Sequence, residues 1–230
     1  MLKMFSRKIL AFCAALVPLF AQAAVIANSE AEFSGVQGQD GWYYGYYELG
    51  RPGMQLMSYY QENGQDSAWF VNNQYFKAFL TAWGGHPQMA SKPNVGGRTG
   101  SEYWTTRRWV SDYEGEVTIS TQIYNMYDFG SMVGYITVNN QSTLAVLDAR
   151  AEGVSGLWLD YTLTLAKGDF IDFIISPNGS DDWDYTTFKA VISTTGSAVP
   201  EPSSASLALL GLVAVAAPAV RRRAKNGRRA

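Results

Sequence analysis

Residues 116–121 have the sequence EVTIST, in which apolar Val117 and Ile119 alternate with polar residues. Alternation with period two is typical of a β-strand that turns one face to the core and the other to solvent. The same alternation recurs at residues 135–138 (YITV) and 161–165 (YTLTL), and these runs contain the β-branched and aromatic residues that strands prefer. The chain is therefore predicted to consist mainly of strands.

Turn-forming residues separate these runs. Asn139 and Asn140 follow residues 135–138, and because Asn tolerates positive φ, the pair predicts a hairpin. Short strands joined by such turns predict an all-β fold, an antiparallel β-sandwich. The remaining predicted elements are turns at 167–169 and 177–179 and strands at 142–147, 170–175 and 186–193.

The N-terminus has the three parts of a secretory signal peptide. Basic residues lie within the first eight positions, an apolar run follows at residues 9–20, and small residues come next. The run is too short to span a membrane. Signal peptidase is therefore predicted to remove residues 1–23 by cutting between Ala23 and Ala24, with Ala21 and Ala23 at the positions that the enzyme reads.

Cysteine content and charge restrict the function of the remaining chain. Cys13 is the only cysteine and lies in the signal peptide, so the mature chain can form no internal disulfide and no cysteine metal site. Residues 24–199 contain 9 basic and 19 acidic residues, a net charge of −10. An acidic domain repels phosphate backbones, which argues against nucleic acid as a partner.

The C-terminus has an apolar run followed by a basic cluster. Residues 205–220 are all apolar or small, and a helix of this length extends about 24 Å, slightly less than the ~30 Å hydrocarbon core of a bilayer. The basic residues at 221–229 are expected to stay cytoplasmic. One interpretation of this hydrophobic helix is a plain membrane anchor.

The segment before the apolar run points to a second interpretation. It contains Val199, Pro200, Glu201 and Pro202, and the apolar run ends at Arg221, Arg222 and Arg223. This arrangement closely resembles the PEP-CTERM sorting domain. The resemblance implies that residues 198–230 are a sorting signal, on which an exosortase, a membrane protease-transpeptidase of exopolysaccharide-producing Gram-negative bacteria, acts at the Pro-Glu-Pro box.

The body of the chain, residues 24–197, resembles a known type of module. The resemblance spans about residues 33–193 and is carried by residues 107–109, 115–119, 168–173 and 177–179. It is to the jelly-roll β-sandwich of carbohydrate-binding modules in secreted bacterial proteins. These motifs are mostly structural, so the resemblance implies a fold more than a ligand.

The sequence gives little support for catalysis. His86 is the only histidine, stands in a glycine-rich stretch at 84–100 that is predicted to be a loop, and is accompanied by no nucleophile-elbow motif. A glycosidase needs only two carboxylates at a set distance, but many acid pairs are possible here and none stands out. The chain is predicted not to be an enzyme.

Aromatic residues are the strongest candidates for binding. All 7 Trp and all 14 Tyr lie between Trp42 and Tyr185, and the densest cluster is residues 42–47 (WYYGYY). Aromatic faces bind the C–H faces of sugars, and a tyrosine hydroxyl can donate a hydrogen bond. Trp42, Tyr44 and Tyr46 share one face of the predicted strand and are the candidate sugar contacts; Tyr43 and Tyr47 share the other. Core packing is the alternative role for either set.

An acidic turn is the candidate metal site. Asp181, Asp182 and Asp184 lie close together in the sequence, and Ca²⁺ prefers carboxylate and carbonyl oxygens. Their spacing is not that of an EF-hand loop, so the alternative is a solvated acidic turn. A structural Ca²⁺ is the one cofactor that the sequence suggests.

Two adjacent arginines belong to a predicted strand. Arg107 and Arg108 must face opposite ways because side chains alternate along a strand. One is expected to be exposed, and the other is expected to pair with an acid such as Asp172 or Asp184.

These features lead to one hypothesis with two alternatives. The chain is predicted to be an exported, non-catalytic protein that is anchored transiently through its C-terminus and then reaches the outer surface or extracellular matrix. Its predicted partners are signal peptidase, an exosortase-type enzyme, the membrane and exopolysaccharide. The alternatives are a structural or adhesive matrix component without a ligand, and a polysaccharide-degrading enzyme.

Overall fold

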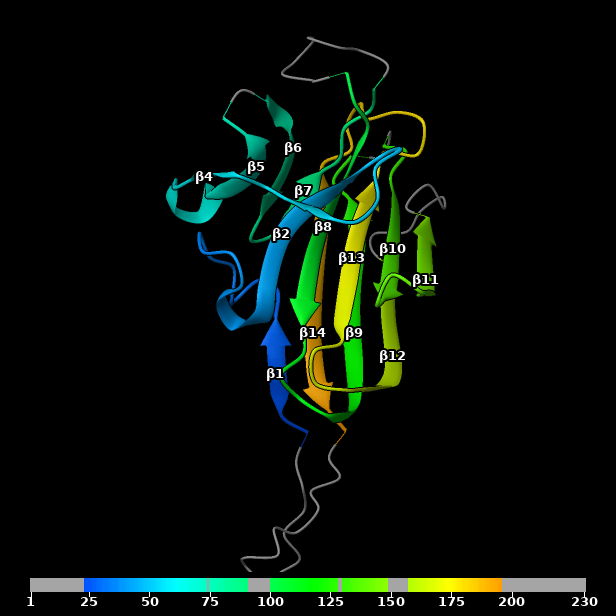
Figure 1. The fold of residues 1–230 in the computed structure, drawn as a ribbon. Coiled ribbons are helices and arrows are strands. Elements are labelled where there is room, and N and C mark those ends of the chain that lie inside the picture. Colours follow the sequence, from blue (N-terminus) through cyan, green and yellow to red (C-terminus); the bar gives the residue numbers. More distant parts are fainter. Residues whose placement is uncertain (1–22, 74, 91–99, 128–129, 149–156, 196–230) are drawn as a thin grey trace, which may run out of the picture. The chain divides into compact units, whose positions relative to one another are not determined.

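The structure, a computed structural model, describes residues 23–73, 75–90, 100–127, 130–148 and 157–195. These residues form strands and two short 3-10 helices (Figure 1). The elements are β1 (Val25–Asn28), η1 (Gln39–Gly41), β2 (Trp42–Glu48), β3 (Gln55–Leu56), β4 (Tyr59–Gln61), η2 (Gly64–Asp66), β5 (Ala68–Asn72), β6 (Tyr75–Thr81), β7 (Gly84–His86), β8 (Tyr103–Val110), β9 (Gly115–Asn125), β10 (Val133–Val138), β11 (Ser142–Asp148), β12 (Leu157–Leu165), β13 (Phe170–Ser176) and β14 (Thr186–Thr194).

Two antiparallel sheets make up the domain. The first is 8-stranded, with the order β12-β9-β14-β7-β6-β5-β4 and with β1 also paired to β14. The second is 6-stranded, with the order β11-β10-β13-β8-β2-β3, and lies in front of the first in Figure 1. The predicted all-β, jelly-roll-like antiparallel β-sandwich is therefore confirmed.

The core lies between the two sheets. The 6-stranded sheet contributes the buried rings of Trp42, Trp109 and Phe173, and the 8-stranded sheet contributes Ile119 and Phe188 to the same cluster. Phe173 and Phe188 meet across the sandwich with ring centroids 5.1 Å apart. Burying one large apolar side chain stabilises a fold by roughly 1.5–3 kcal/mol. This domain therefore has an apolar core that needs no disulfide.

The alternating sequences form strands with the predicted faces. Val117 and Ile119 in β9 are buried in the core, whereas Thr118 and Ser120 point outward and bond to residues of β12. Asn139 and Asn140 have φ of 52° and 55° and connect β10 to β11 as the predicted hairpin turn. The sequence pattern thus determines both the strand type and the side that faces the core.

One predicted loop contains a strand. Gly84–His86, within the stretch 84–100, forms β7 between β14 and β6. A Cβ atom at Gly84 would collide with the backbone carbonyl of Thr186, so the glycine permits a close strand contact here. The glycine content of this part of the stretch reflects strand packing and not a loop. Residues 91–99 lie outside the described residues.

The first and last strands of the domain lie side by side. Val25 of β1 is paired with Ser193 of β14, and Thr194 donates its backbone N–H to the carbonyl of Ala24 at 2.8 Å. Ala23 and Ala24, at the predicted cleavage point, are exposed at this end, whereas Ala21 lies outside the described residues. The cleavage itself stays a prediction.

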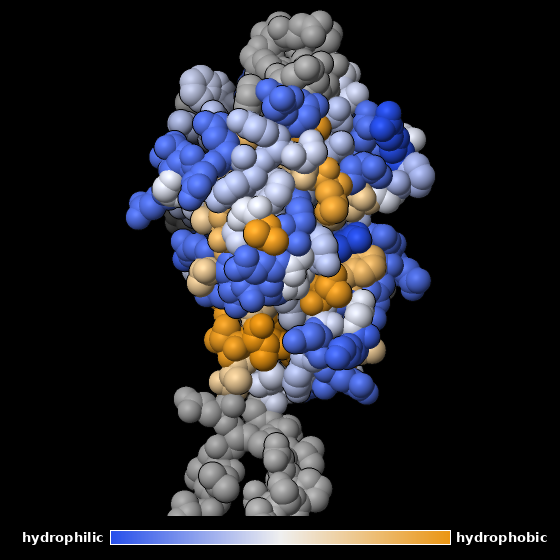
Figure 2. Space-filling view, turned by 60° about the vertical axis from the view of Figure 1, so that its left-hand side comes forward, coloured by the Kyte–Doolittle hydropathy of each residue, from blue (hydrophilic) through white to orange (hydrophobic). Residues whose placement is uncertain are grey.

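No helix within the described part of the chain is long and apolar enough to cross a membrane. The predicted hydrophobic helix at 205–220 lies outside that part, as does the basic cluster at 221–229. On the face shown in Figure 2, hydrophilic residues predominate, with apolar residues in small patches among them.

Candidate functional site

The tyrosines and the tryptophan that were predicted to contact sugar do not form an exposed face. Trp42 and Tyr44 are each 1% exposed, and the Tyr44 ring stacks on Trp69 at 5.9 Å. Trp42 donates its indole N–H to Glu32 Oε2 at 2.8 Å. Tyr46 is half-buried against Tyr103. The prediction that Trp42 and Tyr44 bind sugar is wrong, because their side of β2 faces the core.

The opposite side of β2 carries Tyr47 to the outer face of the 6-stranded sheet. Its hydroxyl oxygen lies 2.6 Å from Asp172 Oδ2 on β13 and 2.6 Å from Asn140 Oδ1 in the β10–β11 turn. Burial and the bond to Asp172 raise the pKa of Tyr47 well above its ordinary value of 10.0. The phenol therefore keeps its proton at neutral pH and stays a hydrogen-bond donor.

An ion pair between Arg108 and Asp172 lies beside Tyr47 on the same outer face. Arg108 donates from Nε to Asp172 Oδ1 at 2.7 Å and from Nη2 to Asp172 Oδ2 at 2.8 Å. The guanidinium lies over the ring of Phe170, 3.8 Å from its centroid. Such a bidentate pair holds both side chains in one geometry. It also makes this part of the face electrically neutral.

A pair of stacked aromatic rings, Trp104 and Tyr135, lies next to Tyr47. Trp104 of β8 is registered with Tyr47 of β2, and its ring stacks on Tyr135 of β10 with centroids 5.6 Å apart and planes 4° from parallel. The Trp104 indole N–H is bonded to Glu102 Oε1 at 2.6 Å. The stack and this bond lock the indole ring in place, so it is preorganised for a contact with a ligand.

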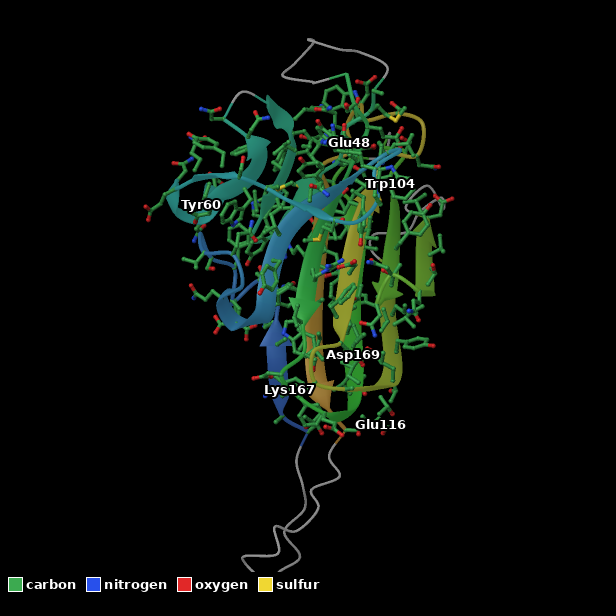
Figure 3. The ribbon with its side chains drawn as sticks, viewed as in Figure 1. Glu48, Tyr60, Trp104, Glu116, Lys167 and Asp169 are labelled. Carbon is green, nitrogen blue, oxygen red and sulfur yellow. The ribbon has the colours of Figure 1, made fainter. Side chains whose placement is uncertain are left out.

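A pocket of about 420 Å³ opens beside these groups. Tyr47, Trp104 and Asn140 line it, together with the loop that follows β2. Arg51 in that loop forms an ion pair of 3.0 Å with Glu48, the last residue of β2. Glu48 and Trp104, labelled in Figure 3, lie toward the end of the sandwich away from Glu116. The volume falls within the usual range for small-molecule sites.

The chemistry of the pocket is aromatic, polar and close to neutral. Asp172 is paired with Arg108 and Glu48 with Arg51, whereas a third acid, Glu102, accepts the Trp104 indole N–H. A glycosidase needs one carboxyl group that can donate a proton and another that stays ionised nearby. Asp172 and Glu48 are each engaged by an arginine, so neither is an unpaired carboxylate beside the pocket.

The sequence reasoning missed this combination of residues. The adjacent arginines do face opposite ways, and Asp172 was correctly predicted as a partner, but it pairs with Arg108, the more exposed of the two, whose side chain is 20% exposed. Arg107 is 1% exposed and is bonded to backbone carbonyl oxygens and not to an acid. Trp104 was missed, although it is a large aromatic residue whose position in β8 turns its side chain away from the core.

His86 lies in the interior and not on an exposed loop. It is the last residue of β7, is 0% exposed, and its ring packs between Phe79 and Tyr185 at 5.8 and 4.9 Å. Its Nδ1 lies 2.5 Å from the carbonyl oxygen of Pro87. This position gives it a packing role.

The acidic turn connects neighbouring loops. Asp181 accepts a bond from the Met89 N–H at 3.0 Å, and Asp184 accepts one from the Ser131 N–H at 2.7 Å. Asp182 is exposed. Within the described ranges, no three acidic, His or Cys side chains are grouped in a way that could hold a metal ion. Calcium at this turn stays a prediction, which melting temperatures in calcium and in chelator would check.

Asp184 is expected to make stability depend on pH. Burial raises its pKa from the ordinary 3.8 to about 7, and Asp181 adds to the rise. Across this window the folded state keeps a proton that the unfolded state releases, so stability falls as pH rises toward 7. In Asp184→Asn that loss should be absent, a difference of at most about 1.4 kcal/mol for each pH unit.

Urea unfolding between pH 4 and 8 measures this effect, with the exposed Asp182→Asn as the matched control. The prediction fails if wild type and Asp184→Asn show the same pH slope, or if wild type is most stable at the upper end of that range.

Comparison with known protein families decides the nature of the C-terminus. Residues 198–224 match the PEP-CTERM protein-sorting motif. This segment is a PEP-CTERM sorting signal. The match includes residues 199–202 and 221–223, as predicted, and it indicates an exported protein that is sorted at the membrane. The segment lies outside the described residues.

Solved structures with some similarity to this chain include three from carbohydrate-active proteins. A β-glucosidase from Kluyveromyces marxianus is 13% identical, with 71% of this chain and 17% of that chain covered and a TM-score of 0.31. The C-terminal CBM6 of LamC, a marine laminarinase from Zobellia galactanivorans, is 11% identical, with 48% and 89% covered and a TM-score of 0.28. A GH26-CBM35 β-(1,4)-mannanase from Podospora anserina is 11% identical, with 79% and 29% covered and a TM-score of 0.32.

The aligned region is a small part of two of these proteins. The chain spans 17% of the β-glucosidase and 29% of the mannanase. No curated protein matches the chain in sequence. The assignment of the fold rests on the two sheets described above.

Proposed function

We propose that this protein is an exported, non-catalytic surface or matrix protein that binds an uncharged polysaccharide on the outer face of its 6-stranded sheet. An exosortase-type enzyme sorts it through the PEP-CTERM signal at residues 198–224. The observation that carries the binding proposal is Trp104, an indole ring fixed by Tyr135 at the side of a neutral pocket.

The chemistry of the pocket supports a sugar ligand. An indole face offers apolar contact to the C–H groups of a pyranose ring. The Asn140 amide N–H groups can donate hydrogen bonds to sugar hydroxyls, and the Tyr47 oxygen, whose proton goes to Asp172, can accept one; both residues line the pocket. Because the one acid and the one base in the lining, Glu48 and Arg51, form an ion pair, the pocket presents no unpaired charge to an uncharged sugar, whereas a polyanion would meet an acidic domain.

Replacing Trp104 by Ala is expected to weaken binding strongly. On the scale of base–aromatic stacking, losing one such contact costs about 1–3 kcal/mol, or about 5- to 150-fold in Kd. The measurement is affinity for soluble β-glucan, mannan, xylan and galactan, with the full chain in a polyoxyethylene detergent that contains no sugar.

Trp183→Ala is the matched control, because Trp183 is an aromatic residue that is 57% exposed and does not line the pocket. Equal affinity of Trp104→Ala and wild type would overturn the proposed site. Failure of the wild type to bind any of the four polysaccharides would favour a structural or adhesive role without a ligand.

A further inference from the structure

The outer face of the 8-stranded sheet has a groove of its own. Its volume is about 570 Å³, and its lining includes Trp83, Gln122, Tyr124, Thr187 and Lys189. In the two strands β9 and β14, the residues that alternate with these are buried in the core, so the lining residues point away from it. Since Trp104 lies on the outer face of the other sheet, the two grooves open on opposite faces of the sandwich.

Charges in this groove are largely balanced. Lys189 Nζ lies 2.6 Å from Glu30 Oε2, so the one cation in the lining is neutralised by an acid in the same lining. Asp66 is also in the lining and leaves it with a net charge of −1. A polyanion or an anionic lipid surface would meet no uncompensated positive charge here. An uncharged ligand suits this groove best.

The groove is lined by both hydrogen-bonding groups and aromatic rings. The strand register places Lys189 opposite Gln122 and Thr187 opposite Tyr124, and Thr187 is also opposite Gly84, the residue that follows Trp83. The Gln122 amide, the Thr187 hydroxyl and the Tyr124 ring therefore lie on the adjacent strands β9 and β14, and the Trp83 ring belongs to the residue just before β7. Aromatic faces beside amide and hydroxyl groups are the combination that recognises a sugar ring.

Trp158 continues this surface onto the next strand. It is paired directly with Gln122 across β12 and β9, and it is 63% exposed. Adjacent strands lie about 4.8 Å apart, so Trp158 stands within reach of a chain that occupies the groove. A tryptophan exposed to this degree contributes little to the core, and stacking against a ligand gives the ring a role.

We propose that this groove, bordered by Trp83, Tyr124 and Trp158, is a second site for uncharged polysaccharide, and that the domain links two polysaccharide chains. The linking, but not the second site itself, rests on the proposed function of the first pocket. Sites on opposite faces cannot be filled by one short stretch of a chain, so each domain holds two segments. Linked segments gain avidity without any new contact, and a mixture of protein and long chains forms a network.

The test uses the full chain in the same detergent with the same four soluble polysaccharides. Titration calorimetry with oligosaccharide fragments gives the number of sites, and light scattering with the long polymers reports linking. We expect two sites in wild type and one site in either Trp104→Ala or Trp158→Ala, with the scattering signal lost in both. Tyr124→Phe, which keeps the ring, is the conservative variant and should retain both sites.

The outcomes separate the two proposals. If Trp104→Ala abolishes all binding, there is one site, and the second-site proposal is wrong while the proposed function stands. If Trp158→Ala abolishes all binding and Trp104→Ala has no effect, the groove is the only site and the first pocket is wrong. Full binding and scattering in Trp158→Ala, with its native circular dichroism spectrum, overturns the second site. Lack of binding by wild type to all four polymers overturns both.

Discussion

Replacing Arg107 by Met is expected to reduce the free energy of unfolding by about 3–5 kcal/mol, because several buried carbonyl acceptors lose their partner at about 1–3 kcal/mol each. Typical domains are stable by only about 5–15 kcal/mol. This substitution should therefore leave the domain partly or wholly unfolded at temperatures that the wild type tolerates.

The reason lies in the partners of Arg107. Its side chain is 1% exposed and donates to the carbonyl oxygens of Ser29 at 3.0 Å, Ala82 at 3.0 Å and Gly84 at 3.2 Å, as well as to that of Thr81. The guanidinium thereby connects β8 to the loop after β1 and to the β6–β7 turn. Burial lowers its pKa from 12.5 to about 10, so it remains charged at neutral pH.

An apolar replacement cannot restore what is lost. A buried ion pair can often be replaced by apolar residues on both sides without loss of stability. Here the acceptors are backbone carbonyls, which no mutation removes, and each buried acceptor left without a partner costs about 1–3 kcal/mol. Arg107→Lys keeps the charge but lacks the planar fork that reaches two segments, so an intermediate loss is expected.

Urea unfolding followed by tryptophan fluorescence measures these differences. Arg51→Met is the matched control: its side chain is 66% exposed in a surface ion pair with Glu48, and such pairs contribute at most about 1 kcal/mol. A loss below about 1 kcal/mol in Arg107→Met, similar to that control, would contradict the account of Arg107 as the link between these segments.

The strands could be predicted because their residues report on local environment. In β9, apolar Val117 and Ile119 alternate with polar residues, and only one assignment of faces is reasonable. Asn139 and Asn140 are adjacent residues that tolerate positive φ, and both adopt it. Such signals lie within a few residues of one another and do not depend on the rest of the fold.

The inward face of β2 could not be predicted in the same way. Residues 42–47 are aromatic on both faces, so alternation separates Trp42 and Tyr44 from Tyr43 and Tyr47 but does not say which set is buried. The neighbouring strands decide this, because Phe173 and Trp69 pack against the Trp42 and Tyr44 side. A one-residue change of phase exchanges the two faces completely.

The candidate sites depend on register between strands that are far apart in the chain. Trp104 meets Tyr135 only because β8 and β10 both pair with β13. Tyr47 meets Asp172 across 125 residues of sequence. No short motif contains these pairs, and a single sequence gives no measure of register. The one available signal in the sequence was that Trp104 and Trp158 each stand at an outward-facing position of an amphipathic strand, where a large ring is free to contact a ligand.

Glu201→Ala is expected to block sorting almost completely while leaving membrane insertion unchanged. Glu201 stands between two prolines in the segment that matches the sorting motif, and it is the only acidic residue beyond Asp184 in this chain. Prolines lack the backbone N–H and restrict the residues before them, so the box cannot continue a helix formed by the apolar run. The box is therefore expected to be an extended substrate that a protease can reach.

Membrane insertion should be unchanged in Glu201→Ala because other parts of the tail are expected to carry it. The apolar run at 205–220 and the arginines at 221–223 are the parts expected to determine insertion and orientation, and the substitution changes neither. A plain anchor has no need of the carboxylate, so only a sorting enzyme would respond to its loss. In a host that carries the enzyme, Glu201→Ala should accumulate in the inner membrane, and the surface-located fraction should fall steeply.

Mass spectrometry of the surface protein, with Ser203→Ala as the matched control next to the box, tests both halves of this argument. Wild type and control should yield no peptide beyond residues 200–202, because the enzyme leaves the apolar segment behind in the membrane. Glu201→Ala should keep its C-terminal peptides. An intact C-terminus through Arg221–Ala230 on most of the wild-type surface protein would mean that the tail serves only as an anchor, since the carboxylate would then have no cleavage to direct.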